Sequence, residues 1–299
     1  MGGERPPGRA SPVPSPESGE KAGDGRALPS HPTAQEAPDA RRFGGVARLL
    51  GDPAAARLRE AHFTVVGIGG VGSWTAEALA RSGVGSLTLV DLDHVTESNI
   101  NRQVQALGST LGAAKGEAMA RRIADIAPNC RVRLVDDFVT PDNADELLPR
   151  DGVVIDAIDQ PRAKAAMIAV CHRRGQPLVV CGGAGAVTDV LGLRHSDLSK
   201  TRGDPLLASV RARLRREHGF PREPGRPFGV TALHFESQRA TGRICAADAG
   251  APLACAGYGS IVTVTGTLGF AAAALAIELT LSWRPPRARR APASPVMSA

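Results

Sequence analysis

Short apolar runs alternate with longer segments of helical periodicity along the middle of the chain. Strands are expected where aliphatic or β-branched runs are flanked by glycine or polar residues, at 63–66, 86–93, 131–137, 152–159 and 177–183. Helices are expected between them, where apolar positions follow a helical period, at 70–83, 114–127 and 162–174 and after Thr140–Pro141. This alternation predicts an α/β fold, a mostly parallel sheet with helices on both faces. Ligands of such sheets lie beyond the carboxyl ends of the strands.

The two ends of the chain show no such periodicity. Residues 1–41 hold eight of the chain's 23 prolines, and residues 284–299 are rich in proline and arginine. Segments that cannot bury apolar surface stay disordered, so both ends are predicted to be disordered tails around a single domain at 42–283. Further strands and a basic helical insertion at about 194–226 are expected to extend this domain.

Two other segments have helical character. Residues 47–61 have a spacing that places Leu49, Leu50 and Leu58 on one side of a helix. Residues 257–283 are almost wholly apolar and long enough to cross a bilayer, a reading that stays open. Because this segment also carries glycines, threonines and an acidic residue, we favour a buried helix of the α/β domain and expect no stable membrane insertion.

The cysteine content and the N-terminal sequence indicate the cellular compartment. The five cysteines contain no Cys-x-x-Cys pair, which argues against a zinc site. An odd number of cysteines without tight spacing fits a reducing compartment. The N-terminus has no apolar stretch typical of a signal peptide. We therefore expect a cytoplasmic protein.

A glycine-rich turn follows the first predicted strand. The sequence GIGGVG contains Gly67, Gly69, Gly70 and Gly72 and leads directly into a predicted helix. The free N–H groups and the positive dipole end of such a helix bind phosphate. Asp91 ends the next strand at the spacing of a carboxylate that accepts hydrogen bonds from a ribose. We interpret this as a Rossmann-like nucleotide site, the alternative being a tight turn without a ligand.

Charge distinguishes a triphosphate from a dinucleotide. Asn99, Arg102 and Gln103 lie on the segment that leaves the second strand, and Lys115 opens the next predicted helix. Arginine binds phosphate oxygens with its fork of donors, and lysine adds a point charge. Asp159 ends a further strand at the same sheet edge and could hold Mg²⁺. Each residue alone could be a solvated loop charge, but their common edge favours ATP.

The motifs carry a resemblance that covers about residues 42–270. Four stretches are similar to the ubiquitin-activating-like adenylyltransferase superfamily: GIGGVGS, DLDHVTESNINRQ, GAAK and DAID. The resemblance implies adenylation of a carboxylate with ATP and Mg²⁺ by a homodimer. It also implies catalytic roles for Arg102, Lys115 and Asp159, with Asp159 serving the metal.

The same resemblance assigns the nucleotide contacts. Asp91 and Asp93 form the pair at the strand end, of which Asp91 holds the ribose. Asn99 and Arg102, followed by Gln103, contact the phosphates, and the arginine often reaches into the partner's site. The glycine turn and Lys115 complete the phosphate site.

Three further stretches point to one branch of the superfamily. RFGGVARLLG (42–51), DDFVTPDN (136–143) and SDLSKTRGDPLLASVRARLRREHGF (196–220) resemble tRNA threonylcarbamoyladenosine dehydratases. The resemblance implies cyclisation of the threonylcarbamoyl side chain on the adenosine next to the anticodon. The alternative is an enzyme that activates the C-terminus of a ubiquitin-like sulfur-carrier protein, with sulfur-relay partners. A nucleotide-binding scaffold without catalysis is a third reading.

The position of the positive charge supports an RNA partner. Between Arg194 and Arg226 nine Lys or Arg face four acidic residues, a net +5 of the chain's formal +6. We expect tRNA phosphates to bind there, at Lys200, Arg202, Arg211 and Arg215. Arg211 and Arg215 lie one helical turn apart and are expected to share an exposed stripe, the alternative being an ordinary solvated helix face.

Thiols and a histidine near the motifs receive no catalytic role. Cys245 and Cys255 flank a Gly/Ala-rich segment, and Cys181 follows a predicted strand. Either Cys245 or Cys255 could serve sulfur transfer, but a small buried or loop thiol is the expected reading. Similar enzymes are not expected to need a thiol at Cys181. His94 is interpreted as a loop residue because adenylation needs no base there.

Overall fold

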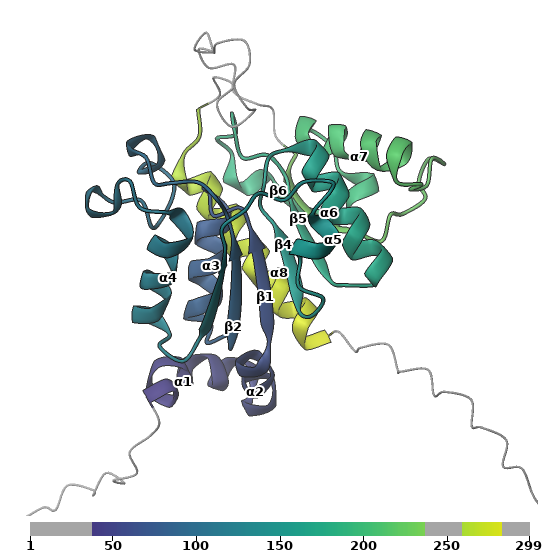
Figure 1. Cartoon of the computed structure of the whole chain (residues 1–299). Coiled ribbons are helices and arrows are strands. Elements are labelled where there is room, and N and C mark those ends of the chain that lie inside the picture. The colour runs from purple at the N-terminus through teal and green to yellow at the C-terminus, as the bar shows by residue number, and fades with distance from the viewer. Residues whose placement is uncertain (1–37, 237–258, 283–299) are drawn as a thin grey trace, which may run out of the picture. The chain divides into compact units, whose positions relative to one another are not determined.

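The computed structural model describes residues 38–236 and 259–282 (Figure 1). The predicted tails, except for residues 38–41, and the segment with Cys245 and Cys255 lie outside these ranges. The first described helix begins at Pro38, so the expected boundary at Arg42 is too late by four residues.

The described elements alternate between helix and strand. The helices are α1 (Pro38–Leu50), α2 (Asp52–Glu60), α3 (Gly72–Arg81), α4 (Lys115–Ile126), α5 (Ala144–Leu147), α6 (Pro161–Arg174), α7 (Pro205–Glu217) and α8 (Val262–Ser282). The strands are β1 (His62–Val66), β2 (Ser86–Val90), β3 (Arg131–Val135), β4 (Val153–Asp156), β5 (Leu178–Cys181), β6 (Leu193–Asp197) and β7 (Thr231–Phe235). Short 3-10 turns are η1 (Glu97–Asn99), η2 (Gly108–Thr110), η3 (Val190–Gly192) and η4 (Leu198–Lys200).

One seven-stranded sheet has the order β3-β2-β1-β4-β5-β7-β6. All neighbouring strands are parallel except β6, which pairs antiparallel with β7. Chain order reverses between β1 and β4, so the loops after these two strands diverge there. A crevice at such a switch point is where ligands of open α/β sheets bind.

Both faces of the sheet are covered, as the sequence predicted (Figure 1). Side chains alternate along β1: Phe63 and Val65 join a core with α3, α4 and α8, while Val66 joins a second core with α6 and α7. Both clusters consist of buried, mostly aliphatic side chains. The predicted α/β class is therefore confirmed.

The apolar segment at 257–283 contains helix α8, which crosses one face of the sheet beside α3. By length and composition alone it could cross a membrane, and 44% of its most apolar window is buried in the protein. Val264, Leu268 and Ala272 are fully buried in the core that it shares with α3. The interpretation as a core helix accounts for this burial.

Some expected boundaries are wrong. Residues 47–61 are not one helix, because Gly51 has a φ of +85° and separates α1 from α2. Leu49 is therefore 83% exposed, whereas Leu58 is buried. The helix expected at Thr140–Pro141 begins only at Ala144.

Four of the five predicted strands are also too long, those expected to end at residues 93, 137, 159 and 183. The strand predicted at 86–93 ends at Val90, and the one predicted at 152–159 ends at Asp156. The polar residues that follow them belong to loops at the carboxyl edge of the sheet.

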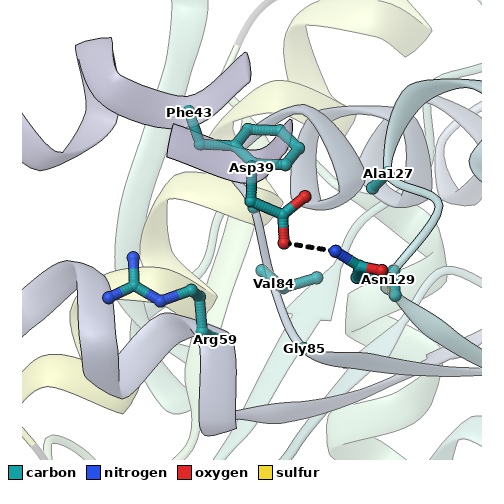
Figure 2. A pocket seen from close by; sticks show the side chains of 9 residues that line it. Asp39, Phe43, Arg59, Val84, Gly85, Ala127 and Asn129 are labelled. Atoms are coloured by element: carbon teal, nitrogen blue, oxygen red, sulfur yellow. Dashed lines mark hydrogen bonds between the residues drawn. The ribbon is translucent and has the colours of Figure 1, made fainter. Parts of the chain in front are cut away.

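Helix α1 is fixed at the opposite end of the sheet, where β1 and β2 begin (Figure 1). Phe43 packs against Gly83, and the Asn129 side-chain amide donates to Asp39 at 2.7 Å (Figure 2). The Arg42 guanidinium donates to the carbonyls of Asp125 and Ile126 at the end of α4. The cavity between them holds about 70 Å³, far too little for a nucleotide.

Candidate active site

The glycine turn links β1 to α3 at the switch point. Gly67 has a φ of +87°, and its N–H donates to the Val90 carbonyl at 2.9 Å. A Cβ at Gly72 would lie 1.8 Å from the Gly67 oxygen, so the turn closes only on glycine. A Cβ at Gly69 would meet nothing within 4 Å. The turn is thus tightly packed at Gly67 and Gly72 but open at Gly69, where a phosphate could approach the helix N-terminus.

Asp91 connects this turn to the end of β2. Its Oδ2 accepts the Ile68 N–H at 2.5 Å, and its Oδ1 accepts the Asp93 N–H at 2.8 Å. Burial raises the pKa of the Asp91 carboxyl, against the opposing effects of the Lys115 charge and the backbone donors. Asp91, the residue predicted to bind the ribose, is therefore held in one orientation beside the turn.

Lys115 joins the same network from the first residue of α4. Its Nζ donates to Asp93 Oδ2 at 2.8 Å, and its backbone N–H donates to the Asp93 carbonyl at 2.9 Å. The side chain is 8% exposed, so this cation is shielded from bulk water. A backbone bridge between His94 and Ala114 brings the two segments together. Hydrogen bonds therefore run without a break from Lys115 through Asp93 and Asp91 to the turn.

Arg102 lies against the turn from the other side. A Cβ at Gly70 would come within 3.3 Å of the Arg102 stem and 3.1 Å of Thr265 on α8. The guanidinium Nη1 donates to the Ser98 carbonyl at 2.8 Å and to Asn101 Oδ1 at 2.9 Å. In this structure the arginine head thus bonds to its own segment, while the stem packs against Gly70 of the turn.

Asn99 and Gln103 have contacts that the sequence did not reveal. Asn99 is buried and its Oδ1 accepts the Thr96 N–H at 3.1 Å, which caps η1. Gln105, a residue that the motif reading missed, donates to the Ile68 carbonyl at 2.9 Å and to Gln103 Oε1 at 3.2 Å. These amides hold the segment that carries Arg102, and no spacing rule distinguishes Gln105 beforehand.

Asp159 lies three residues beyond β4 and is half-buried. The two residues before it, Ala157 and Ile158, contact the turn: a Cβ at Gly67 would lie 2.9 Å from Ile158 Cγ2. Within the described part of the chain, no hydrogen bond or ion pair engages its carboxylate. The same ranges contain no group of three or more His, Cys, Asp or Glu side chains that could together hold a metal ion. One free carboxylate fits Mg²⁺, which takes few protein oxygens and completes its shell with phosphates and water.

A buried ion pair behind Asp159 was not predicted. Lys164 of α6 donates to Asp156 Oδ1 at 2.7 Å, and both side chains are 0% exposed. Burial raises the pKa of the Asp156 carboxyl to about 6, although the Lys164 charge and hydrogen bond oppose this. One signal was present in the sequence: Asp156 follows the apolar run VVI, and Lys164 lies among the alanines of the next helix.

The basic segment differs from its prediction. Lys200 and Arg202 are exposed, as an RNA contact requires. Arg211 and Arg215 are half-buried: Arg211 donates to Thr201 Oγ1, and Arg215 stacks 5.1 Å from the ring of Phe228. The exposed stripe predicted for these two arginines is therefore wrong, because both side chains bond within the protein.

The same surroundings also shift the pKa of Arg211. Burial, together with the neighbouring Arg215 charge, lowers the pKa of the Arg211 guanidinium. The insertion itself begins as an edge strand, β6, before it forms α7.

The described cysteines have no features of nucleophiles. Burial raises the pKa of Cys171 and Cys181 to about 12 and that of the half-buried Cys130 to about 11. Thiols with such pKa values stay protonated and unreactive.

The site thus gathers the glycine turn, Asp91, two cations and the Asp159 carboxylate at one sheet edge. The sequence model of the ThiF family matches this chain over residues 45–293. The chain belongs to the ThiF family. Its membership confirms the predicted resemblance to the ubiquitin-activating-like adenylyltransferases.

Individual members of the family narrow the comparison. The tRNA threonylcarbamoyladenosine dehydratase of Escherichia coli is 46% identical over 248 residues, 79% of this chain and 92% of that protein. The enzyme of the same name from Haemophilus influenzae is 44% identical over 243 residues, 80% of this chain and 93% of that protein. A crystal structure of the E. coli enzyme with ATP superposes with a TM-score of 0.73 at 44% identity, covering 81% of this chain and 94% of that one.

Proposed function

We propose that this ThiF-family protein is an ATP-dependent tRNA threonylcarbamoyladenosine dehydratase. It adenylates the carboxylate of threonylcarbamoyladenosine next to the anticodon and promotes cyclisation of the side chain. The hydrogen-bonded path from Lys115 through Asp93 and Asp91 to the glycine turn carries this proposal, because it holds a shielded cation beside a phosphate site. A sequence identity of 44% to one of the dehydratases, over 80% of this chain, supports the same substrate.

The reaction has two steps. The threonyl carboxylate oxygen attacks the α-phosphorus of ATP, and pyrophosphate leaves to give an acyl-adenylate. The carbamoyl group of the same side chain then attacks the activated carbonyl, AMP departs, and a proton is released to solvent. The ring closes without an enzyme nucleophile because the reacting groups are already in one molecule.

The chain's own groups stabilise the charge that develops on the phosphates. The α3 N-terminus offers backbone donors, and Lys115 and Arg102 lie on either side of the turn. Donors fixed in advance need little reorganisation during the reaction, so their effect is larger than in water.

The magnesium role is the finer part of the proposal. Asp159 would hold Mg²⁺, which when bound neutralises phosphate charge. Its support is the free, half-buried carboxylate next to the segment that contacts Gly67. Asp91 would hold the ribose.

The proposal also includes the partners and the location of the protein. tRNA would contact the exposed Lys200 and Arg202. A homodimer is expected from the superfamily, and exposed Ile100, Leu107 and Leu111 near the site supply apolar surface for it. A cytoplasmic location follows from the tRNA substrate, and sulfur-relay partners stay a prediction.

One assay tests the function directly. The protein is incubated with ATP, Mg²⁺ and either threonylcarbamoylated tRNA or a sulfur-carrier protein, and AMP is measured. We expect AMP only with the modified tRNA; AMP that requires the carrier protein would favour the alternative enzyme, and ATP binding without AMP a scaffold.

A variant pair connects this function to the site. Lys115→Ala should abolish AMP formation while the unfolding midpoint stays near that of the wild type. Arg121→Ala, an exposed position on the same helix, is the matched control and should remain active. Normal AMP release by Lys115→Ala would refute the assigned role.

A further inference from the structure

The ion pair between Lys164 and Asp156 lies behind the proposed site and takes no part in the chemistry described so far. Both side chains are wholly buried, on α6 and at the end of β4. Asp156 Oδ2 is also buried and finds no hydrogen-bond donor among the described residues. A buried pair with one unsatisfied oxygen is a poor way to stabilise a core, because apolar residues of similar size are often as good or better. The pair therefore calls for another explanation.

The pair fixes backbone where two strands end. Besides the Asp156 carboxylate, the Lys164 ammonium donates to the Asp156 carbonyl at 3.3 Å and the Cys181 carbonyl at 2.9 Å. It thus binds the last residues of β4 and β5 to each other. The same oxygen that accepts from Lys164, Asp156 Oδ1, also accepts the Ile158 N–H at 3.3 Å.

These bonds act on the segment that leads to Asp159. Ile158 is held by Asp156, and Ala157 donates its N–H to the Val66 carbonyl at 2.9 Å. The same two residues pack directly against Gly67 of the glycine turn. Contacts through Ala157 and Ile158 therefore connect the buried pair to the glycine turn and to the segment that ends at Asp159.

We propose that Lys164 and Asp156 are a positioning pair, which fixes residues 157–159 so that the Asp159 carboxylate is held beside the phosphate turn. The proposal rests on the metal role given to Asp159 above. It assigns neither buried residue a contact with substrate. If the two charges are removed and the protein still folds, binding of the metal with the nucleotide should therefore weaken.

Two neutral double variants separate positioning from folding. Asp156→Leu with Lys164→Met removes the charges and the hydrogen bonds but keeps the volume. Asp156→Asn with Lys164→Gln removes the charges and keeps hydrogen-bonding groups. Arg162→Ala, exposed on the same helix, is the control. Unfolding in urea shows which variants are folded.

The main readout is binding of Mn²⁺ with ATP, followed by electron paramagnetic resonance. We expect at least about a tenfold loss of Mn²⁺ affinity in the Leu/Met variant, the usual size of an effect exerted through a ligand's supporting residue. The Asn/Gln variant should lose less. Adding Asp159→Asn to the Leu/Met variant should cost little more, because both changes remove the same interaction.

Unchanged Mn²⁺ affinity in a folded Leu/Met variant would overturn the proposal. So would unfolding of both double variants, since the pair would then serve the fold itself. Hydrogen exchange of residues 157–159, measured without nucleotide, should be faster in the Leu/Met variant. If Asp159→Asn alone leaves Mn²⁺ binding unchanged, the metal role fails, and the exchange measurement still decides whether the pair fixes this segment.

Discussion

Replacing Gly69 with alanine is expected to weaken ATP binding without destabilising the fold. A Cβ at this position would meet nothing within 4 Å, and the residue does not have a positive φ. Such a substitution changes the free energy of unfolding by at most about 1 kcal/mol, and often favourably. The new methyl group would, however, occupy the space above the turn where we place the phosphates. We expect at least a roughly tenfold loss of ATP affinity, or about 1.4 kcal/mol.

Gly67→Ala is the contrasting variant. Its φ of +87° costs an alanine about 1–2 kcal/mol. The new Cβ would also lie 2.9 Å from Ile158 Cγ2 and 3.2 Å from the Ala157 backbone, and overpacking of this kind costs about 1–3 kcal/mol. Together these effects predict a loss of about 2–5 kcal/mol in the free energy of unfolding.

Urea denaturation and isothermal titration with ATP distinguish the two variants. Gly69→Ala should unfold at the wild-type midpoint yet bind ATP poorly, whereas Gly67→Ala should lose stability as well. If Gly69→Ala bound ATP as tightly as the wild type, the phosphates could not lie above this turn. A fully stable Gly67→Ala would mean that the turn has another conformation.

Three further outcomes are expected. Glu77→Gln should lose about 1–3 kcal/mol in urea unfolding, because the buried Glu77 accepts from Arg122 at 2.6 and 3.0 Å; an unchanged midpoint would contradict this. Burial opposes ionisation of Asp197, but hydrogen bonds from its neighbours outweigh it and lower its pKa. Asp197 therefore stabilises the fold above its unfolded pKa of about 4 and loses this effect as the pH falls through the lower folded value. Hence the stability gap between wild type and Asp197→Asn, measured in urea, should be largest at pH 7 and close in acid. Combined Lys200→Ala and Arg202→Ala should weaken tRNA binding and reduce the salt dependence of log K by roughly 1–2 units, while an unaltered slope would exclude phosphate contacts there.

Local patterns in the sequence determined the order and type of most elements. Alternating strand and helix periodicities predicted the parallel sheet, and parallel strands necessarily place their carboxyl ends on one edge. The glycine turn, Asp91 and Lys115 could be assigned to that edge for this reason, and their hydrogen bonds confirm that they meet. These features depend on neighbours in the chain, so a single sequence contains them.

Contacts between distant segments decided the rest. Arg211 donates to Thr201, ten residues away, and α1 docks on the end of α4 and on Gly83, contacts that its own pattern does not indicate. The pair of Asp156 and Lys164 forms only because α6 packs over the ends of β4 and β5. Whether a charged side chain is solvated or buried depends on what packs against it. The packing partners are set by the assembled sheet and its helices, so the local periodicity of the sequence does not indicate them.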